Sequence, residues 1–385
     1  MKLTPAFFQE ILDITEEVKI SNEKRLTSLW AGYGTISSVQ VRSKKANKNL
    51  IIKRVNPPRK CSLSSIGDQR KIKSYHVEGY FYEKLVPYIL KWKDVVKCDI
   101  AQPYFIEQTH DEEDSEPSFL FIMSDLSDSH GMYYDGSKEQ VIAIIGWLAS
   151  FHSIFYNHPD VMEAKTGNGK IWPEGGYWHL KTRLSELESI PSYYRALKES
   201  AYAVDKRMND GPDLYYTLVH GDFKEANIMI GGGSKKDSFS CAAVDYQYCG
   251  RGFGAKDIVM LIVSSVSPQV LKAIGGEDGV IQLYADELKK NVNAMNEMSK
   301  EDIEIITSFD TLKMQYELAM VDYVRFMAGW GFWGSNSDFA ERRAIEILKD
   351  IASSWSGRSR NGDCTINTFT KKDWESAIYE KYPLL

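Results

Sequence analysis

Residues 218–230 read LVHGDFKEANIMI, and residues 243–247 read AVDYQ. The first stretch holds a polar loop and ends in an apolar run at 228–230, the second begins apolar and then turns polar, and a glycine-rich segment at residues 231–234 lies between them. Two apolar runs joined by such a turn predict a β-hairpin. The hairpin would bring Asp245 back beside the loop that holds Asp222 and Asn227.

Two carboxylates and a carboxamide in one place form a set of hard oxygen ligands. Mg²⁺ prefers such ligands when it shares its coordination shell with phosphates. An aspartate that can accept a hydroxyl proton beside them completes the requirements for phosphoryl transfer, in which catalysis is mainly positioning and charge neutralisation. The alternative is that Asp222 and Asp245 are ordinary turn acids.

The segments on either side of this motif differ in character. Upstream, a helical pattern from Pro5 to about Lys19 precedes short β-type runs at 26–30, 38–42 and 50–55, a helical pattern at 69–88, and a strand pair at 102–108 and 118–124. An acidic loop at 111–116 joins that pair, as a solvated hairpin tip or a cation site. Downstream of Leu126, the patterns at 140–155, 180–187, 191–208, 269–296, 300–327 and 338–354 are helical. We therefore predict a β-rich front lobe and a mainly helical rear lobe that meet near residues 124–128.

Composition narrows the class of partner. The 385 residues carry a net charge of −6 without a basic stripe, so we expect no nucleic-acid partner. No apolar run reaches the ~20 residues that span a bilayer, and the N-terminus lacks the pattern of a signal peptide. Five dispersed cysteines indicate reduced thiols, so we expect a cytoplasmic protein. The sequence carries no signal for the oligomeric state.

The motif resembles the catalytic signature of the aminoglycoside phosphotransferase and choline kinase superfamily. The residues that carry it are His220-Gly221-Asp222-x-Lys224-x-x-Asn227 and Val244-Asp245-Tyr246-Gln247. With Glu78-x-x-Phe81-Tyr82-x-x-Leu85 upstream, the chain is most similar to the ecdysteroid-kinase-like branch. The resemblance implies an α+β, bilobal protein-kinase-like fold, with a small antiparallel-sheet N-lobe and a larger, mainly helical C-lobe. It implies a nucleotide-binding lobe at residues 1–125 and a catalytic, substrate-binding lobe at 126–385.

The resemblance also implies an activity and a set of roles. The activity would be transfer of the γ-phosphate of ATP, with Mg²⁺, to a hydroxyl or amine of a small-molecule acceptor. Asp222 would be the catalytic base, and Lys224 would neutralise charge near the transferred group. Asn227 and Asp245 would hold Mg²⁺, whereas His220 would brace the loop.

Nucleotide contacts are expected in the front lobe. Gly32-x-Gly34 lies between two predicted strands and could cradle phosphates through backbone N–H groups, or it could be a plain turn. Lys53 is a charge inside an apolar strand and could face water. The resemblance instead implies that Lys53 contacts the nucleotide phosphates and pairs with a helix glutamate, for which Glu78 is the first choice and Glu83 the second.

Two further segments take their expected roles from position in the family. Residues 119–126 would form the last strand and the hinge between the lobes, which places Met123 and Asp125 beside the adenine. Leu148-Ala149-Ser150-Phe151-His152 resembles a family helix, in which His152 would be a buried histidine that braces the catalytic loop.

Departures from related families limit the choice of acceptor. Asp245-Tyr246-Gln247 replaces the Asp-Phe-Gly of protein kinases, and no Ala-Pro-Glu follows, which disfavours a protein substrate. Lys224 and Gln247 also depart from the usual residues of the ecdysteroid-kinase-like and choline kinase branches. Choline or ethanolamine kinase, an antibiotic-modifying phosphotransferase and a non-catalytic pseudokinase remain alternatives. Arg251 and Lys256, in a glycine-rich passage, could attract an anion or could be solvated loop residues.

The densest aromatic stretch runs from Tyr323 to Trp333. The chain is rich in aromatic residues, with 9 Trp, 22 Tyr and 16 Phe. Aromatic faces could cage a quaternary ammonium or stack on a flat lipophilic ring. The alternative is that this stretch only packs the core.

Overall fold

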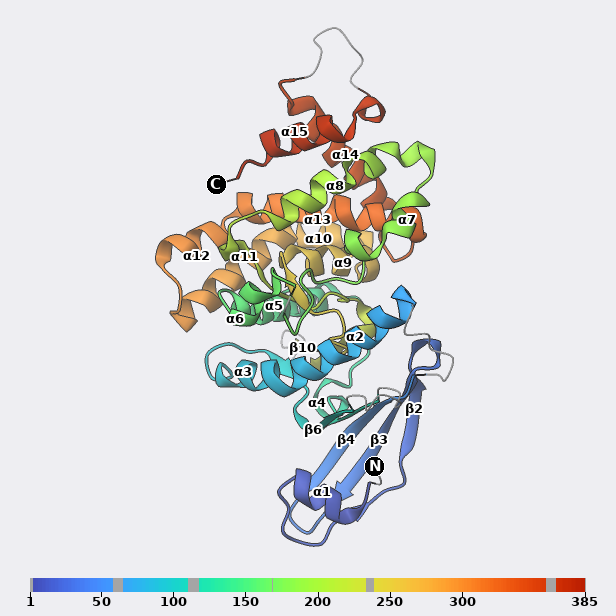
Figure 1. Cartoon of the computed structure of the whole chain (residues 1–385). Coiled ribbons are helices and arrows are strands. Elements are labelled where there is room, and N and C mark those ends of the chain that lie inside the picture. The colour runs from blue at the N-terminus through green and yellow to red at the C-terminus, as the bar shows by residue number, and fades with distance from the viewer. Residues whose placement is uncertain are drawn as a thin grey trace.

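The computed structural model describes residues 3–57, 65–109, 118–167, 169–232, 239–357 and 365–384, and of Ile66 only the backbone. The acidic stretch 111–116, the turn residues Gly233 and Ser234, and Cys61 and Cys364 lie outside these residues. Figure 1 shows two lobes, with the sheet at one end, the helices at the other, and α2 (Ile66–Tyr80) at their junction.

The smaller lobe is built on an antiparallel sheet with strand order β1-β3-β4-β7-β6, in which β2 also pairs with β3. The strands are β1 (Lys19–Ile20), β2 (Lys24–Ser28), β3 (Gly34–Arg42), β4 (Asn47–Val55), β6 (Pro103–Gln108) and β7 (Phe119–Ser124). Strand β4 lies at the centre, paired in register with β3 and β7. The predicted strands are therefore present, and β3 begins earlier than its apolar pattern suggested.

Both faces of this sheet are covered. Leu50 and Ile52 of β4 pack in a small cluster with Phe8 of α1 (Pro5–Ile11). Val55, two residues beyond Lys53, belongs instead to the main core. Because successive strand residues alternate between faces, Lys53 shares the inner face with Val55 and is only 4% exposed. The possibility that Lys53 faces water is thereby excluded.

The first helix is shorter than its apolar pattern predicted. Thr4 caps it and Pro5 begins it, as expected, but it ends at Ile11 instead of reaching about Lys19. Asp13 adopts a positive φ of 52°, which turns the chain toward β1. The apolar residues beyond this turn, Ile14 and Val18, pack against the sheet without continuing the helix.

Helix α2 joins the lobes. A π-helical turn (Phe81–Leu85) and α3 (Val86–Lys91) continue it, so the helix predicted at 69–88 is present and longer. The hydroxyl of Ser74 donates a hydrogen bond to Oε1 of Gln247 at 3.0 Å, and Nη1 of Arg70 donates to the Thr182 carbonyl at 2.7 Å. These bonds hold α2 against the larger lobe.

The larger lobe is mainly helical. Its longer helices are α5 (Lys138–Phe155), α8 (Arg195–Asn209), α9 (Ala255–Ser265), α11 (Gly276–Met295), α13 (Phe309–Trp330) and α14 (Ser337–Ser354). The shorter ones are α4 (Ser127–His130), α6 (Pro159–Ala164), α7 (Leu184–Glu188), α10 (Pro268–Ile274), α12 (Lys300–Thr307) and α15 (Lys371–Lys381). Helix α13 is central and contacts α7, α8, α9, α11, α12 and α14.

Two predicted long helices are each divided in the structure. The pattern at 269–296 splits into α10 and α11 at Gly275 and Gly276, which both have positive φ. The pattern at 300–327 splits into α12 and α13 at Ser308, whose side chain caps the second helix. Helix α15, near the C-terminus, was not predicted.

The fold class is confirmed: the chain is α+β and bilobal, with a small antiparallel-sheet lobe and a larger, mainly helical lobe. Cys98, Cys241 and Cys249 are free thiols. Among the described residues, no helix is both long enough and apolar enough to cross a membrane.

Candidate active site

The predicted hairpin brings the motif residues together. Strand β9 (Ile228–Gly232) begins directly after Asn227, and β10 (Phe239–Ala243) ends two residues before Asp245. The strands pair antiparallel with Ile228 opposite Ala243. The apolar stretch 218–230 is not one strand, because β8 (Thr217–Val219) ends before the loop that carries His220, Gly221 and Asp222.

This loop is held by a buried carboxylate, that of Asp257 in α9. Its Oδ2 and Oδ1 accept hydrogen bonds from the backbone N–H groups of His220 and Gly221, at 2.6 and 2.9 Å. His152 Nε2 lies 3.1 Å from Oδ2 of Asp257, and its Nδ1 lies 2.8 Å from the Tyr284 hydroxyl. His152 therefore reaches the loop through Asp257.

Gly221 is required by the geometry of the loop. Its φ is +80°, and a Cβ here would lie 2.2 Å from the Tyr248 carbonyl oxygen. His220 is fully buried, with Nε2 3.1 Å from the Val244 carbonyl oxygen. Burial lowers the pKa of His220. The neutral ring thus links the loop to the chain just before Asp245.

Asp222 is nearly buried and has two side-chain partners. Nζ of Lys224 lies 3.0 Å from each carboxylate oxygen, and Nδ2 of Asn227 donates to Oδ2 at 3.1 Å. Burial raises the pKa of Asp222 to about 6, against the opposing effect of Lys224 and with a further rise from Asp245. The carboxylate is therefore ionised at neutral pH and has a higher proton affinity than an ordinary aspartate.

Lys53, Glu78 and Asp245 form a buried chain of charges across the lobes. Nζ of Lys53 lies 2.8 and 2.7 Å from the two carboxylate oxygens of Glu78 and 3.2 Å from Oδ1 of Asp245. Glu83 instead has an exposed side chain, paired with Lys84. Burial works against the charged form of Lys53, but the Asp245 and Glu78 carboxylates outweigh it and raise its pKa. The lysine is held as a cation.

Asp245 remains ionised although it is largely surrounded by protein. Burial alone would raise its pKa, but Lys53 and the hydrogen bond from Nε2 of Gln247 at 2.6 Å hold it below its usual value. Asp245 has a positive φ of 71°, in the left-handed region that aspartate tolerates better than most residues. The backbone at this position is constrained beside the site.

A cavity of about 720 Å³ opens over these groups, between α2 and the larger lobe. Asp222, Lys224 and Asp245 line it, so the motif faces open space. Its basic residues are Arg70, Lys71, Arg183 and Lys224, and its aromatic residues are Trp30, Tyr33, Tyr75, Tyr177, Tyr248, Trp330 and Trp333. The predicted residues Lys53 and Asn227 lie behind this lining, in contact with Asp245 and Asp222, and Glu78 contacts Lys53.

The glycine pair lies at the edge of the front lobe. Gly32 has a φ of +74°, and its N–H donates to the Leu29 carbonyl at 3.3 Å within the turn. A Cβ on Gly34 would lie 1.9 Å from the Arg54 carbonyl oxygen, so close strand packing requires this glycine. Neither glycine lines the cavity, whereas the neighbouring Trp30 and Ala31 do.

Met123 is the penultimate residue of β7, and Asp125 follows the strand at the junction between the lobes. Met123 is buried in the main core, and the Asp125 N–H donates to the Asn49 carbonyl at 3.0 Å. The Asp125 carboxylate accepts from the N–H of Ser127 at the start of α4. The structure does not bring either residue into the cavity that holds Asp222.

The aromatic stretch 323–333 serves both of the roles considered for it. Tyr323 and Phe326 are fully buried in the core, whereas Trp330 and Trp333 line the cavity. Trp330 stacks on Phe326 with 5.7 Å between ring centroids and remains 57% exposed. The end of α13 thus presents aromatic faces toward the motif.

Arg183 occupies part of these aromatic faces and was not found from the sequence. Its guanidinium carbon lies 5.3 Å from the ring centroids of Phe326 and Trp330 and 5.6 Å from that of Tyr177. Nε donates to the Tyr177 carbonyl at 2.7 Å, and Nη1 donates to Glu186 at 2.9 Å. A protein cation thus already stacks on the rings that could have caged a ligand cation.

Two more cations were missed, Arg70 and Lys71 of α2. Nζ of Lys71 lies 4.9 Å from the Trp30 ring centroid, inside the cavity. Burial lowers the pKa of Lys71, and the neighbouring charge of Lys53 lowers it further. A basic pair in the first turns of the predicted helix was the available signal, but basic pairs on helices are common.

Arg251 and Lys256 fit neither expected role. Arg251 is 2% exposed, stacks on the Tyr216 ring and pairs with Asp213 at 3.1 Å. Lys256 is 1% exposed and pairs with Glu174 at 3.2 Å. Both are buried structural cations outside the cavity lining, because the glycine-rich passage folds into strand β11 (Gly250–Gly252) and α9 instead of an open loop.

The family comparison covers the segment that carries most of this geometry. Residues 179–297 match the ecdysteroid kinase-like family. This segment is a little under a third of the chain and contains Asp222, Asn227 and Asp245. The match confirms the resemblance read from the motif. No curated protein matches the chain by sequence.

Three similar solved structures are distant in sequence from this chain. A microcompartment-associated aminopropanol kinase is 11% identical, with 90% of this chain and 98% of that chain covered and a TM-score of 0.47. An ethanolamine kinase of Plasmodium vivax is 11% identical, with coverages of 85% and 82% and a TM-score of 0.42. A choline kinase of Cryptosporidium parvum is 12% identical, with coverages of 86% and 88% and a TM-score of 0.38.

Proposed function

We propose that the chain transfers the γ-phosphate of ATP, with Mg²⁺, to a hydroxyl group of a small-molecule acceptor. The observation that carries the proposal is the position of Asp222. Its carboxylate faces a cavity, has a raised proton affinity, and is held by Lys224 and Asn227 beside the ionised Asp245. This is the arrangement that in-line phosphoryl transfer to a hydroxyl requires.

Asp222 would orient the acceptor hydroxyl and receive its proton. A pKa of about 6 suits this task, because the group is ionised at neutral pH and still basic enough to take a proton as the O–P bond forms. Lys224 would then neutralise charge on the transferred phosphoryl group. Its Nζ lies within hydrogen-bond distance of both Asp222 oxygens, so the same cation would contact both the base and the transferred phosphoryl group.

The donor atoms present fit Mg²⁺. Asp245 is ionised and reaches the cavity, and Nδ2 of Asn227 is turned toward Asp222, which leaves the amide oxygen as its remaining polar atom. Carboxylate and amide oxygens are suitable ligands for this ion, which when bound would neutralise charge on the phosphates. We assign Asn227 and Asp245 to this role.

Lys53 would contact the nucleotide phosphates, and Glu78 would hold it in place through the buried ion pair. Lys71 is a second candidate for phosphate contact because its cation lies inside the same cavity. Gly32 and Gly34 would shape the edge of the nucleotide site, and Met123 and Asp125 would mark the adenine end. The lobe boundary would then fall between residues 125 and 126.

The lining of the cavity favours an uncharged acceptor with a flat apolar body. Trp330, Trp333 and Tyr177 offer ring faces, whereas Arg183 already stacks on two of the three. Among the described lining residues the carboxylates are Asp222, Asp245 and Asp68, and the last accepts a hydrogen bond from the Tyr33 hydroxyl. A quaternary ammonium or a polycationic antibiotic would therefore face repulsion from the basic side chains of this lining.

A phosphate-transfer assay tests the proposal. Wild type and Asp222→Asn would be given Mg–ATP and four acceptor types: a hydroxylated fused-ring compound, choline, ethanolamine and an aminoglycoside. We expect turnover by wild type with the first type and a loss of about 10³-fold or more in the variant. Equal turnover by both proteins would reject Asp222 as the base.

The pseudokinase alternative has its own readout. Mg–ATP should raise the melting temperature of wild type, since a ligand that binds only the folded state stabilises it. A clear thermal shift without turnover of any acceptor would favour a pseudokinase that binds nucleotide. Absence of both would contradict the assignment of a nucleotide site.

A further inference from the structure

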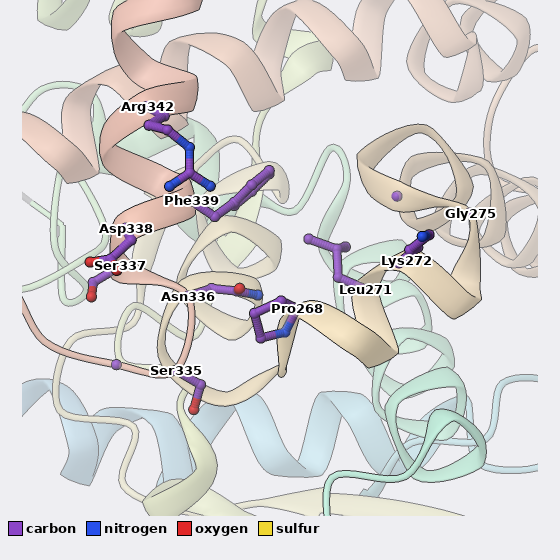
Figure 2. Close-up of a pocket in the computed structure, with 12 residues that line it drawn as sticks. Pro268, Leu271, Lys272, Gly275, Ser335, Asn336, Ser337, Asp338, Phe339 and Arg342 are labelled. Carbon is purple, nitrogen blue, oxygen red and sulfur yellow. The ribbon is translucent and has the colours of Figure 1, made fainter.

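A second cavity, of about 690 Å³, lies in the larger lobe and shares no lining residue with the cavity over Asp222. It is bounded by α10, the turn at Gly275, the loop before α14, and the first turns of α14. Figure 2 shows Phe339 and Arg342 of α14 on one side and Leu271 and Lys272 of α10 on the other. The volume is within the range of small-molecule sites.

Asn336 supplies an unused polar atom at this cavity. It is 2% exposed, and its Nδ2 donates to the carbonyls of Ile262 and Val266, at 3.2 and 2.7 Å. Since only the NH₂ group can face two carbonyl oxygens, the amide orientation is fixed. Oδ1 has no hydrogen-bond partner within the described part of the chain, and the residue lines the cavity. A hydrogen-bond donor that entered the cavity would satisfy this buried acceptor.

The N-terminus of α14, at the edge of this cavity, also favours an anion. Asn336 is the residue before its first turn, yet no side chain caps the helix, because the Asn336 amide is committed to the end of α9. The first backbone N–H groups of an 18-residue helix therefore lack a side-chain acceptor. Uncapped N–H groups and the helix dipole both favour a negative charge here.

Two basic side chains reinforce this preference. Lys272 and Arg342 line the cavity from opposite sides, and neither forms an ion pair with any residue that the structure describes. By contrast, the adjacent Arg343 pairs with both Glu277 and Glu317. Asp338 also lines the cavity, but Figure 2 shows its carboxylate directed away from Leu271 and Lys272.

We propose that this cavity binds a small organic anion, a carboxylate or a phosphate, that carries an apolar body and a hydrogen-bond donor. Arg342 and Lys272 hold the anionic group. Phe339 and Leu271 contact the apolar body, and Oδ1 of Asn336 accepts the hydrogen bond from the donor group. The site is separate from the proposed phosphoryl-transfer site, so its existence does not depend on that function.

The loop between α13 and α14 contributes lining residues to both cavities. Trp333 lines the cavity over Asp222, and the next residue, Gly334, lines this one. A Cβ on Gly334 would lie 2.6 Å from the Val263 carbonyl, so the loop is closely packed on the end of α9. In the same region, the Ser265 hydroxyl accepts a hydrogen bond from the N–H of Glu225 in the catalytic loop. A single closely packed loop therefore supplies lining residues to both cavities.

Calorimetric titration of the full chain tests the site. The carboxylate probe is 4-hydroxyphenylacetate and the phosphate probe is 4-hydroxyphenyl phosphate. Phenylacetate lacks the donor, and 4-hydroxybenzyl alcohol lacks the charge. We expect saturable binding of at least one hydroxylated anion in the millimolar range or below, and binding at least about tenfold weaker for both truncated probes. The two hydroxylated anions distinguish a carboxylate site from a phosphate site.

Variants locate the binding. Arg342→Glu and Lys272→Glu change exposed residues and should each weaken binding about tenfold or more. Lys349→Glu makes the same charge change farther along α14 and should leave the affinity unchanged, as should Lys71→Ala in the other cavity. Lack of saturable binding of both anions would overturn the proposal. Equal affinity in wild type and Arg342→Glu, or loss of binding in Lys71→Ala alone, would overturn it as well.

Discussion

Asp257 Oδ1 accepts a hydrogen bond from the backbone N–H of Gly221 at 2.9 Å, which holds the residue immediately before Asp222. The second oxygen of the same carboxylate takes the N–H of His220 and lies 3.1 Å from His152. One fully buried side chain, on a helix 35 residues later in the chain, therefore determines where the proposed base lies.

Asp257→Asn should loosen this loop. The amide would present a donor where the carboxylate accepts from N–H groups, so we expect a loss of about 3 kcal/mol in the free energy of unfolding, measured by urea denaturation. We also expect kcat to fall by roughly 10–100-fold because Asp222 is no longer held. Asp338→Asn is the control, because it also removes a carboxylate from the first turn of a helix. Asp338 is exposed, so this variant should lower the free energy of unfolding by less than about 1 kcal/mol. Equal losses in the two variants would show that helix-end electrostatics, not the loop, explains the effect.

Asp222→Asn should change how stability depends on pH. Burial raises the pKa of Asp222 to about 6 in the folded protein, above its unfolded value, so ionisation costs folding free energy as the pH rises through 6. The asparagine variant lacks this cost. Relative to wild type, the free energy of unfolding of the variant should therefore rise between pH 4 and pH 8, by up to about 3 kcal/mol. Urea denaturation at several pH values measures this difference, and parallel curves would contradict the raised pKa.

Glu78→Gln should break the buried pair with Lys53. Both side chains are almost fully buried, at 6% and 1% exposure, so the lysine would keep its charge with only Asp245 as a close partner. We expect a loss of about 3 kcal/mol in unfolding free energy and a raised KM for ATP. Glu83→Gln, one helical turn away and exposed, should stay within about 0.5 kcal/mol. A similar loss in both variants would argue against the Lys53–Glu78 contact.

The sequence was sufficient to predict the hairpin and the charges around it, because these depend on short-range rules. Apolar runs, a glycine-rich turn and hard-ligand residues at its two ends placed Asp222, Asn227 and Asp245 together. The helix at 69–88 was likewise clear from its periodicity, whereas the choice of Glu78 as the partner of Lys53 came from the family resemblance. Helix breaks at Gly275 and Ser308 were less visible, since the apolar pattern continues across both.

What the sequence could not predict depends on contacts between distant segments. Arg183 stacks on rings from residues 177, 326 and 330, and no local pattern indicates that these meet. Arg251 and Lys256 are in a glycine-rich segment typical of loops, yet both are buried and pair with Asp213 and Glu174, which are distant in the sequence. Oδ1 of Asn336 lacks a hydrogen-bond partner among the described residues, because the NH₂ group of the same amide donates to carbonyl groups at the end of α9.

Lys224→Met should move the acid limb of the pH profile of kcat/KM to higher pH. Lys224 lowers the pKa of Asp222 against burial, so its removal leaves a more basic carboxylate that is protonated at a higher pH. We also expect kcat to fall by roughly 10–100-fold through the loss of charge near the phosphoryl group. Lys224→Arg should restore most of the pH shift. An acid limb that does not move in Lys224→Met would reject Asp222 as the group that titrates.

Trp330→Ala should weaken acceptor binding without affecting the nucleotide. Trp330 lines the cavity with a ring that is 57% exposed, and a flat acceptor stacked on it would lose that contact area. We expect KM for the acceptor to rise about tenfold while KM for ATP is unchanged, as measured by steady-state kinetics with each substrate varied in turn. Tyr193→Ala is the matched control, because Tyr193 is 70% exposed, also contacts a neighbouring ring and lies outside the cavity lining. If both variants kept the wild-type KM for the acceptor, the acceptor would bind away from α13, and the aromatic residues at its end would have only a packing role.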